Sequence, residues 1–169
     1  TNVLLAHRLF EYSKIISANF IHASTGSVYS WNGEKMIIDE DTIPVPYSEY
    51  GLSKYLADIT LKSLCEHADI CLRILRYPMI YGGASVNNYI GEIYRSALND
   101  EAIEMTQETA ERVIDIVHID DVVETNISLI NNFDNSINKD IFLVGSGTSL
   151  SVLEITRQIK KSVDSNSTV

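Results

Sequence analysis

Apolar and polar residues alternate along this chain in two rhythms, one typical of helices and one typical of buried strands. Apolar residues at every third or fourth position predict helices, and these cover 2–14, 48–67, 88–99, 120–133 and 149–163. Short apolar runs predict strands, and these cover 19–24, 71–76, 113–119 and 141–145. Strands separated by helices favour a parallel sheet with helical crossovers. The pattern therefore predicts an α/β fold.

Turn-forming and unpatterned stretches separate these elements. Residues 31–47 hold an Asn-Gly pair, an acidic run and two prolines, which predicts a loop. The sequence MIYGG at 79–83 is expected to lead away from the preceding strand through its two glycines, and the stretch up to about 112 shows no clear pattern. Ser149 or Ser151 is expected to cap the last helix, because serine side chains bond the backbone N–H groups of a first turn.

The helix predicted over 48–67 carries apolar residues on two sides. At about 100° per residue, the two sides collect Leu52, Tyr55, Leu56 and Ile59, and Tyr50, Lys54, Ala57, Leu61 and Cys65. A helix that is apolar on both sides is covered twice. The sheet covers one side, and either a second helix of the same chain or a helix of a second subunit covers the other.

Composition and charge exclude several classes of function. Apolar residues make up 45% and charged residues 21%, which is ordinary for a globular protein. The net charge of −10 argues against nucleic acid as a partner, because phosphate binding needs a basic face. No stretch approaches the ~20 apolar residues of a membrane span. The start lacks both a signal-peptide pattern and a Met, so we expect a cytoplasmic protein whose beginning is missing here.

Cysteine and histidine give no sign of a metal site. Cys65 and Cys71 lack metal-ligand spacing, and we expect both to be buried reduced thiols. The four histidines are scattered along the chain without clustered carboxylates, so no metal is expected.

Tyr50 and Lys54 are the first candidate chemical groups. Residues four apart on a helix lie on one face, so the phenol and the ammonium can share a pocket. A free phenol has a pKa near ~10, and a neighbouring cation lowers the pKa of a phenol. Such a pair suits general acid–base catalysis on a sugar or alcohol hydroxyl. One isolated Tyr-x-x-x-Lys is weak evidence, so the surrounding residues decide.

Hydroxyl groups gather where the strand at 19–24 ends. Ser24, Thr25 and Ser27 lie in the sequence ASTGSVY, and loops beyond the carboxyl ends of parallel strands are where α/β sheets bind ligands. A hydroxyl there can hold the reacting oxygen of a substrate. The alternative is that these residues only form the turn after the strand.

Six blocks of sequence follow one another in a recognisable order, namely NV at 2–3, STGSVY at 24–29, YGLSK at 50–54, RYPMIYG at 76–82, VHIDDVV at 117–123 and VGSG at 144–147. This order resembles the extended short-chain dehydrogenase/reductase family, the NAD-dependent epimerases and dehydratases that modify nucleotide sugars. The resemblance covers residues 2–163. It implies a Rossmann-like parallel sheet, the C-terminal half of a dinucleotide-binding domain, with a small α/β substrate-binding portion. Residues 1–82 would be the partial catalytic domain, and 83–169 the substrate-binding portion interleaved with returning Rossmann elements.

The resemblance also implies a role for individual residues. Tyr50 would be the general acid/base, Lys54 its partner and a ligand of the nicotinamide ribose, and Thr25 the catalytic hydroxyl. The cofactor, NAD or NADP, would be lined by Asn2, Ala23, Ser24, Tyr50, Lys54 and Tyr77. The nucleotide-sugar substrate would meet Thr25, Ser27, Met79, Asn88 and Arg112.

The chain departs from the family pattern in several places. The glycine-rich phosphate loop is absent, because the nearest sequence, VGSGTSL, has Leu150 where a third glycine would fall. We therefore expect the isolated chain to bind NAD poorly, and its strand at 19–24 to lack a neighbour unless a further segment or a second chain supplies one. Family dehydratases place Asp-Glu after the catalytic hydroxyl, whereas Gly26 and Ser27 stand here, so dehydration is disfavoured. Ile114 replaces a substrate-side arginine of the family.

Three hypotheses for function follow. The first is an NAD(P)-dependent nucleotide-sugar epimerase or 4-keto reductase, of which this chain is the catalytic part. The second is a truncated, non-catalytic remnant that acts as a dimerisation or scaffold module. The third, a steroid or small-ketone reductase of the same superfamily, is disfavoured by the long C-terminal section. The expected partner is a second copy bound through the helices at 2–14 and 48–67, or a complementary N-terminal segment.

Overall fold

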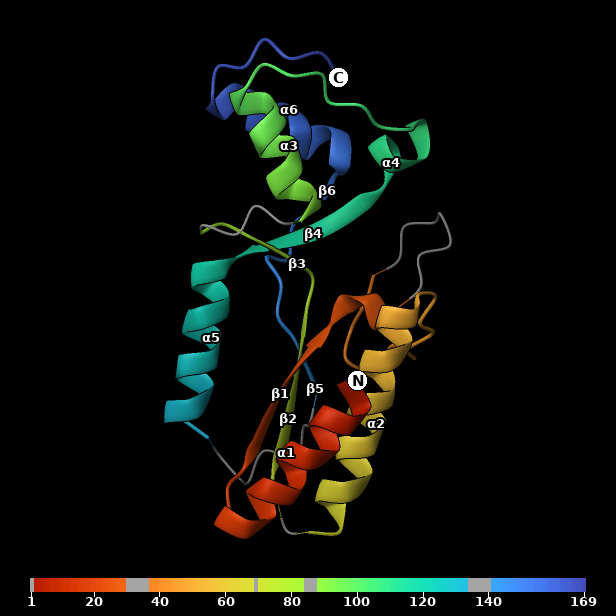
Figure 1. The fold of residues 1–169 in the computed structure, drawn as a ribbon, viewed down its shortest axis with the longest axis vertical. Helices are drawn as coiled ribbons and strands as arrows, with labels where there is room; N and C mark the ends of the chain where they lie inside the picture. Colours follow the sequence, from red (N-terminus) through yellow and green to blue (C-terminus); the bar gives the residue numbers. More distant parts are fainter. Residues whose placement is uncertain (1, 30–36, 69, 84–87, 134–140) are drawn as a thin grey trace. The chain divides into compact units, whose positions relative to one another are not determined.

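The computed structural model describes residues 2–29, 37–68, 70–83, 88–133 and 141–169. The chain divides into two compact units, Thr1–Pro78 with Ser128–Val144, and Met79–Ile127 with Gly145–Val169. Each unit is described by itself below (Figure 1). The division falls after Pro78, because the strand that starts at Met79 pairs within the second unit.

The first unit is a three-stranded parallel sheet with two helices packed on it. Its elements are α1 (Asn2–Ile16), β1 (Phe20–Thr25), the short 3₁₀ helix η1 (Gly26–Val28), α2 (Glu49–Glu66), β2 (Leu72–Tyr77) and β5 (Ile141–Leu143). The strand order is β1-β2-β5, and both pairings are parallel. Figure 1 shows α1 and α2 side by side along this sheet. The predicted α/β fold is confirmed.

The core of this unit lies between the two helices and the sheet. The buried apolar side chains of this core are Ala6, Phe10, Ala57, Leu61, Cys65, Ile70, Leu72 and Ile74. All six residues of β2 are buried, as expected for the central strand of a parallel sheet. The packing fixes α2 over the carboxyl ends of β1 and β2, where register pairs Ser24 with Arg76 and Thr25 with Tyr77.

β1 lies at the edge of its sheet. Among the described strands it pairs with β2 alone, and three of its six residues are only partly buried. This agrees with the expectation that the strand at 19–24 lacks a neighbour on one side within the described residues. An unpaired edge presents backbone N–H and C=O groups that can accept a further strand.

The two sides of α2 differ in burial. The side with Ala57, Leu61 and Cys65 packs on the core, whereas Leu52, Leu56 and Ile59 are exposed, Leu56 by 41%. No helix of the described residues covers that second side. α1 is a second helix of the same chain that packs on α2, but it leaves Leu52, Leu56 and Ile59 exposed.

The second unit combines a small mixed sheet with short helices. Its elements are β3 (Met79–Tyr81), α3 (Tyr89–Leu98), α4 (Gln107–Glu111), β4 (Val113–His118), β6 (Ser149–Ser151) and α6 (Val152–Ser162), and α5 (Ile119–Asn131) continues into the first unit. The strand order is β3-β4-β6, with β3 parallel and β6 antiparallel to β4. A second core packs Ile93, Ala97, Ile103 and Val152 together.

Four local predictions were wrong. Residues 79–81 are not simply an exit from a strand but a strand of the second sheet, because they pair with β4. The last helix begins at Val152 rather than 149, since 149–151 pair with β4, and Ser151 is its cap. The stretch before 112 contains α4. Cys71 is a free thiol, as is Cys65, but it is only half-buried.

Candidate active site

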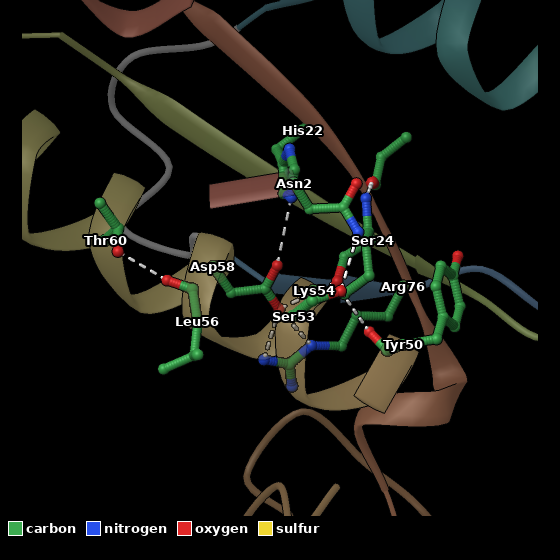
Figure 2. A network of polar contacts seen from close by, with 11 residues as sticks. Asn2, His22, Ser24, Tyr50, Ser53, Lys54, Leu56, Asp58, Thr60 and Arg76 are labelled. Carbon is green, nitrogen blue, oxygen red and sulfur yellow. Dashed lines mark hydrogen bonds and ion pairs between the residues drawn. The ribbon is translucent and has the colours of Figure 1, made fainter. Parts of the chain in front are cut away.

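Tyr50 and Lys54 lie in the first two turns of α2, beside the end of β1. Ser48 caps this helix, because its hydroxyl accepts a hydrogen bond from Gly51 N at 3.0 Å. Tyr50 is 56% exposed, whereas Lys54 is half-buried. The Lys54 ammonium donates to the Ala23 carbonyl oxygen, one residue before Ser24 (Figure 2). The Tyr-x-x-x-Lys face of α2 is thereby fixed at the carboxyl end of β1.

Gly51 makes this close approach sterically possible. A β-carbon added there would stand 2.1 Å from the Ser27 carbonyl oxygen, well inside contact distance. Glycine lets one backbone approach another closely, and here it brings the first turn of α2 against η1. Gly51, which lies between Tyr50 and Lys54, is therefore needed for this packing of the site.

Thr25 ends β1 and also caps η1. It is buried, its hydroxyl accepts a hydrogen bond from Ser27 N at 3.1 Å, and it donates to the Ser27 hydroxyl at 3.2 Å. These are the hydrogen bonds that the turn-forming interpretation of the hydroxyls predicts. It does not exclude the catalytic one, because a hydroxyl proton can rotate toward another acceptor.

A buried polar network lies beneath Lys54. Asp58 Oδ2 accepts hydrogen bonds from the Ser24 hydroxyl at 3.0 Å and from Arg76 Nε and Nη2 at 3.2 and 3.1 Å. Arg76 Nη1 donates to the Tyr29 hydroxyl at 2.7 Å. Asp58 Oδ1 lies 3.4 Å from His22 Nε2, and within the described residues neither of these two buried atoms has a hydrogen-bond partner. Figure 2 shows the carboxylate between α2 and the strands.

Two opposing effects act on the pKa of the Lys54 ammonium. Burial lowers the pKa of the Lys54 ammonium below its ordinary value, because a charge is costly away from water. The negative charge of Asp58 acts in the opposite direction and raises that pKa, without cancelling the effect of burial. Lys54 is thus a cation that gives up its proton more readily than a surface lysine.

The predicted cofactor residues all belong to the first unit. Asn2 Nδ2 donates to the Ser53 hydroxyl at 2.8 Å, joining α1 to α2. Ala23 is exposed, Ser24 is buried with its hydroxyl on Asp58, and Tyr77 is buried. Their contact with a cofactor stays a prediction. For Ser24 the hydroxyl is already engaged, so any such contact would come from its backbone.

The predicted substrate residues are divided between the units. Thr25 and Ser27 lie in the first unit, whereas Met79, Asn88 and Arg112 lie in the second. Asn88 caps α3, since its Oδ1 accepts from Gly91 N at 2.9 Å, and its Nδ2 donates to the Ile80 carbonyl at 2.8 Å. Arg112 is exposed where α4 ends. Their roles toward a substrate stay predictions.

The sequence VGSGTSL does not form a phosphate-binding loop. The Asp115 carboxylate accepts from the backbone N–H groups of Ser146 and Gly147 at 3.2 and 3.3 Å, which are the groups that a phosphate would need. The segment leads into β6 rather than directly into a helix. Its rejection as a phosphate loop therefore agrees with the structure.

Sequence reasoning missed the roles of Asp58 and His22, and it noted Tyr29 and Arg76 only as parts of blocks. A signal was present, because charged residues are rarely buried unless they are paired. Asp58 stands among apolar residues one turn beyond Lys54, and Arg76 stands in an otherwise apolar strand. Only the structure shows that these two charges meet.

Two further features of the described residues bear on ligands. None of the helices they form has both the length and the apolar character needed to cross a membrane. They also contain no group of three or more His, Cys, Asp or Glu side chains arranged to hold a metal ion.

A parallel sheet with crossover helices, and with tyrosine, lysine and hydroxyl groups at the end of one strand, defines a Rossmann-like α/β protein. Residues 1–145 match the NAD dependent epimerase/dehydratase family. The chain belongs to this family.

Individual relatives support the same assignment. The chain is 28% identical to an ADP-L-glycero-D-manno-heptose-6-epimerase of Brachyspira hyodysenteriae, over 90% of this chain and 51% of that protein. It is 27% identical to a CDP-abequose synthase of Salmonella muenchen, over 99% of this chain and 54% of the relative. The chain thus spans about half the length of these relatives.

Solved structures show the same fold. A UDP-glucose 4-epimerase of Thermotoga maritima with UDP-glucose superposes with a TM-score of 0.87 at 26% identity, over 98% of this chain and 54% of that one. A UDP-glucuronic acid 4-epimerase of Bacillus cereus, in complex with UDP-glucuronic acid and NAD, gives 0.88 at 24% identity, over 99% and 53% of the two chains.

Proposed function

We propose that this chain is the catalytic and substrate-binding part of an NAD(P)-dependent nucleotide-sugar epimerase, with 4-keto reduction as the closest alternative reaction. One observation carries the proposal. The Lys54 ammonium bonds the Ala23 carbonyl oxygen, which brings the Tyr50–Lys54 face of α2 to the strand end that bears Thr25. A phenol, an ammonium and a hydroxyl in one place suit proton transfer to and from a sugar hydroxyl.

The residues of the first unit fit one end of a dinucleotide better than the other. Lys54 offers a half-buried ammonium beside the exposed Ala23, suited to the hydroxyls of a nicotinamide ribose. The described residues provide no loop of unoccupied backbone N–H groups for the pyrophosphate, since Asp115 fills the one candidate. When bound, NAD or NADP supplies reversible hydride acceptance. Firm binding is expected to need polypeptide beyond these 169 residues.

Tyr50, Lys54 and Thr25 divide the proton chemistry among them. Tyr50 accepts the proton of the reacting sugar hydroxyl and later returns it to the same oxygen. Lys54 stabilises the phenolate form of Tyr50, which is the form that can accept this proton. Thr25 turns its hydroxyl from Ser27 to the sugar oxygen and holds it in place. For epimerisation, the 4-keto sugar would present its opposite face before it receives the hydride back at C4 and the proton back at the oxygen.

Epimerisation or reduction fits this strand end better than dehydration. Gly26 and Ser27 follow Thr25, so no carboxylate stands directly after the catalytic hydroxyl to remove water from the sugar. The buried carboxylate of the network, Asp58, already accepts from Arg76 and Ser24 through Oδ2.

The test is Tyr50→Phe in the longest polypeptide that the gene encodes, assayed with UDP-, GDP- and dTDP-sugars in the presence of NAD or NADP. We expect turnover to fall by about 10²–10⁴, the usual contribution of general acid–base catalysis, with cofactor binding retained. Tyr47→Phe is the matched control, because Tyr47 is 93% exposed and just precedes α2. Unchanged turnover of Tyr50→Phe would remove Tyr50 from the mechanism. A wild type without turnover would favour the alternative, a non-catalytic dimerisation or scaffold module.

The exposed apolar faces of α1 and α2 support a second copy of the chain as partner. The side chains at helical spacing are Leu5, Leu9, Tyr12 and Ile16 on α1, and Leu52, Leu56 and Ile59 on α2. Large exposed apolar patches mark interaction sites, and a two-fold dimer pairs the same patch from each subunit. These helices lie side by side, so two copies would bury four helices together.

The cytoplasm stays the expected compartment.

A further inference from the structure

We propose that Asp58 is a positioning residue for Lys54. Paired with Arg76 and bonded by Ser24, its carboxylate holds α2 in register with the end of β1 and acts through its charge on the ammonium one helical turn away. The inference rests on the proposed function, since proton transfer is what gives Lys54 its role. It extends that function to residues that touch neither the reacting sugar nor the cofactor.

Asp58 fastens α2 to both neighbouring strands at once. Its Oδ2 accepts from Ser24 on β1 and from two nitrogens of Arg76 on β2, at 3.0 to 3.2 Å. Lys54, one turn earlier on α2, bonds the carbonyl of Ala23, the residue before Ser24. Two successive turns of α2 are therefore tied to two successive residues of β1. A rotation or slide of the helix would break both attachments together.

The Asp58–Arg76 pair is buried, so water screens its charges only weakly across the one helical turn to Lys54. Asp58 is 2% exposed and Arg76 is 3% exposed. Charges in such surroundings are screened less than charges in water. The groups that face the carboxylate are His22 from β1 and Arg76 from β2, with Lys54 on the same helix, and Tyr29 meets the far side of the guanidinium.

Helix packing alone gives no reason to keep this pair. Replacing a buried ion pair by apolar residues of similar volume is often neutral or stabilising, so stability is a weak explanation for it. Two features point to Lys54 instead. Asp58 lies one turn from Lys54 and opposes the effect of burial on its pKa. Arg76 balances the carboxylate, so that Lys54 meets a nearly neutral pair rather than a bare charge.

The charge arrangement makes a prediction of opposite sign for the two partners. Asp58→Asn leaves Arg76 as an unbalanced cation, which disfavours the ammonium and lowers the pKa of Lys54. Arg76→Gln leaves Asp58 as an unbalanced anion, which raises it. The double variant removes both charges and is expected to return the pKa of Lys54 close to that of the wild type.

The experiment is competitive amine labelling with acetic anhydride from pH 7 to 11, followed by mass spectrometry of the peptide that contains Lys54. It needs neither substrate nor cofactor. Lys62, an exposed lysine farther along α2, is the internal control. We expect the Lys54 midpoint to fall by about one pH unit in Asp58→Asn and to rise in Arg76→Gln, the effect of one neighbouring charge. The Lys62 midpoint should stay within about 0.2 units.

Midpoints that do not move, or that move in the same direction in both single variants, would overturn the proposal, since loss of packing alone acts alike in both. Samples are kept at 10 °C in an osmolyte that favours the folded state, and circular dichroism checks folding. A folded Asp58→Asn variant suffices to test the sign, because loss of packing would raise the Lys54 midpoint whereas loss of the carboxylate charge lowers it. If neither folds, Asp58→Glu keeps the charge and shifts the carboxylate by a methylene; turnover within twofold of wild type then overturns the proposal. A wild type without turnover contradicts the proposed function, while the labelling result still decides the role of Asp58.

Discussion

Gly51 and Ser27 lie so close that the gap between them admits no side chain. A β-carbon at Gly51 would stand 2.1 Å from the Ser27 carbonyl oxygen, which is backbone and cannot turn aside. The contact joins the first turn of α2, which bears Tyr50, to the turn after β1, which Thr25 caps. The distance between the Tyr50 phenol and the Thr25 hydroxyl therefore depends on Gly51, which has no reactive group.

Gly51→Ala is expected to destabilise the protein by about 1–3 kcal/mol, the usual range for overpacking, and to reduce turnover more than Leu52→Ala does. The added methyl must push α2 away from η1. Urea unfolding gives the stability and sugar-nucleotide turnover gives the activity. Leu52 is exposed and serves as the neighbouring control. An Ala variant as stable and active as wild type would show that the close contact does not hold the site together.

Lys54 should make stability depend on alkaline pH. Its folded pKa is lowered, so between that value and the ordinary ~10.4 the unfolded chain binds more protons than the folded one. Stability therefore rises with pH through this window, relative to a variant without the amine. We expect wild type to gain stability over Lys54→Met between pH 8 and ~10.4, as measured by urea unfolding. Parallel pH profiles of the two proteins would contradict this.

The start of α6 offers a test of two neighbouring serines. The Ser151 hydroxyl accepts from Glu154 N at 3.2 Å, while Glu154 Oε2 accepts from Ser151 N at 2.8 Å, which completes a capping box. Ser151→Ala should cost about 1 kcal/mol of unfolding free energy. Ser149→Ala should cost nearly nothing, because Ser149 lies in β6 and is exposed. Equal costs in chemical denaturation would show that the cap does not act as described.

Leu56→Glu should convert the proposed dimer to a monomer. A carboxylate at the centre of the exposed side of α2 would have to be buried without a partner, which is costly. Light scattering after size exclusion measures the mass. The control is Leu98→Glu, an exposed leucine of α3 in the second unit. A wild type that is monomeric at high concentration would exclude this interface.

The isolated 169-residue chain should not bind NAD in the micromolar range, as measured by isothermal titration calorimetry. The described residues hold the candidates for the ribose end, whereas Asp115 occupies the backbone N–H groups of VGSGTSL, the sequence nearest to a phosphate loop. Micromolar affinity would show that residues of this chain grip the pyrophosphate in some other way.

The amino-acid sequence alone predicts the helices and strands of the first unit and the one-turn spacing of Tyr50 and Lys54 on α2. These depend on residues a few positions apart, whose spacing states directly which side chains share a face. It also determined the resemblance to the family, since the six blocks keep their order along the chain.

Contacts between residues far apart in the chain follow from the packing of the elements and not from spacing along the sequence. Ser24 and Asp58 are 34 positions apart, and Arg76 lies a further 18 positions beyond Asp58, so their contact depends on how α2 packs across β1 and β2. The same holds for residues 79–81 and 149–151, which became strands because β4 was there to pair with them. Strand formation needs a partner from elsewhere in the chain, whereas a helix bonds itself, and for that reason two of the four errors fell on short strands.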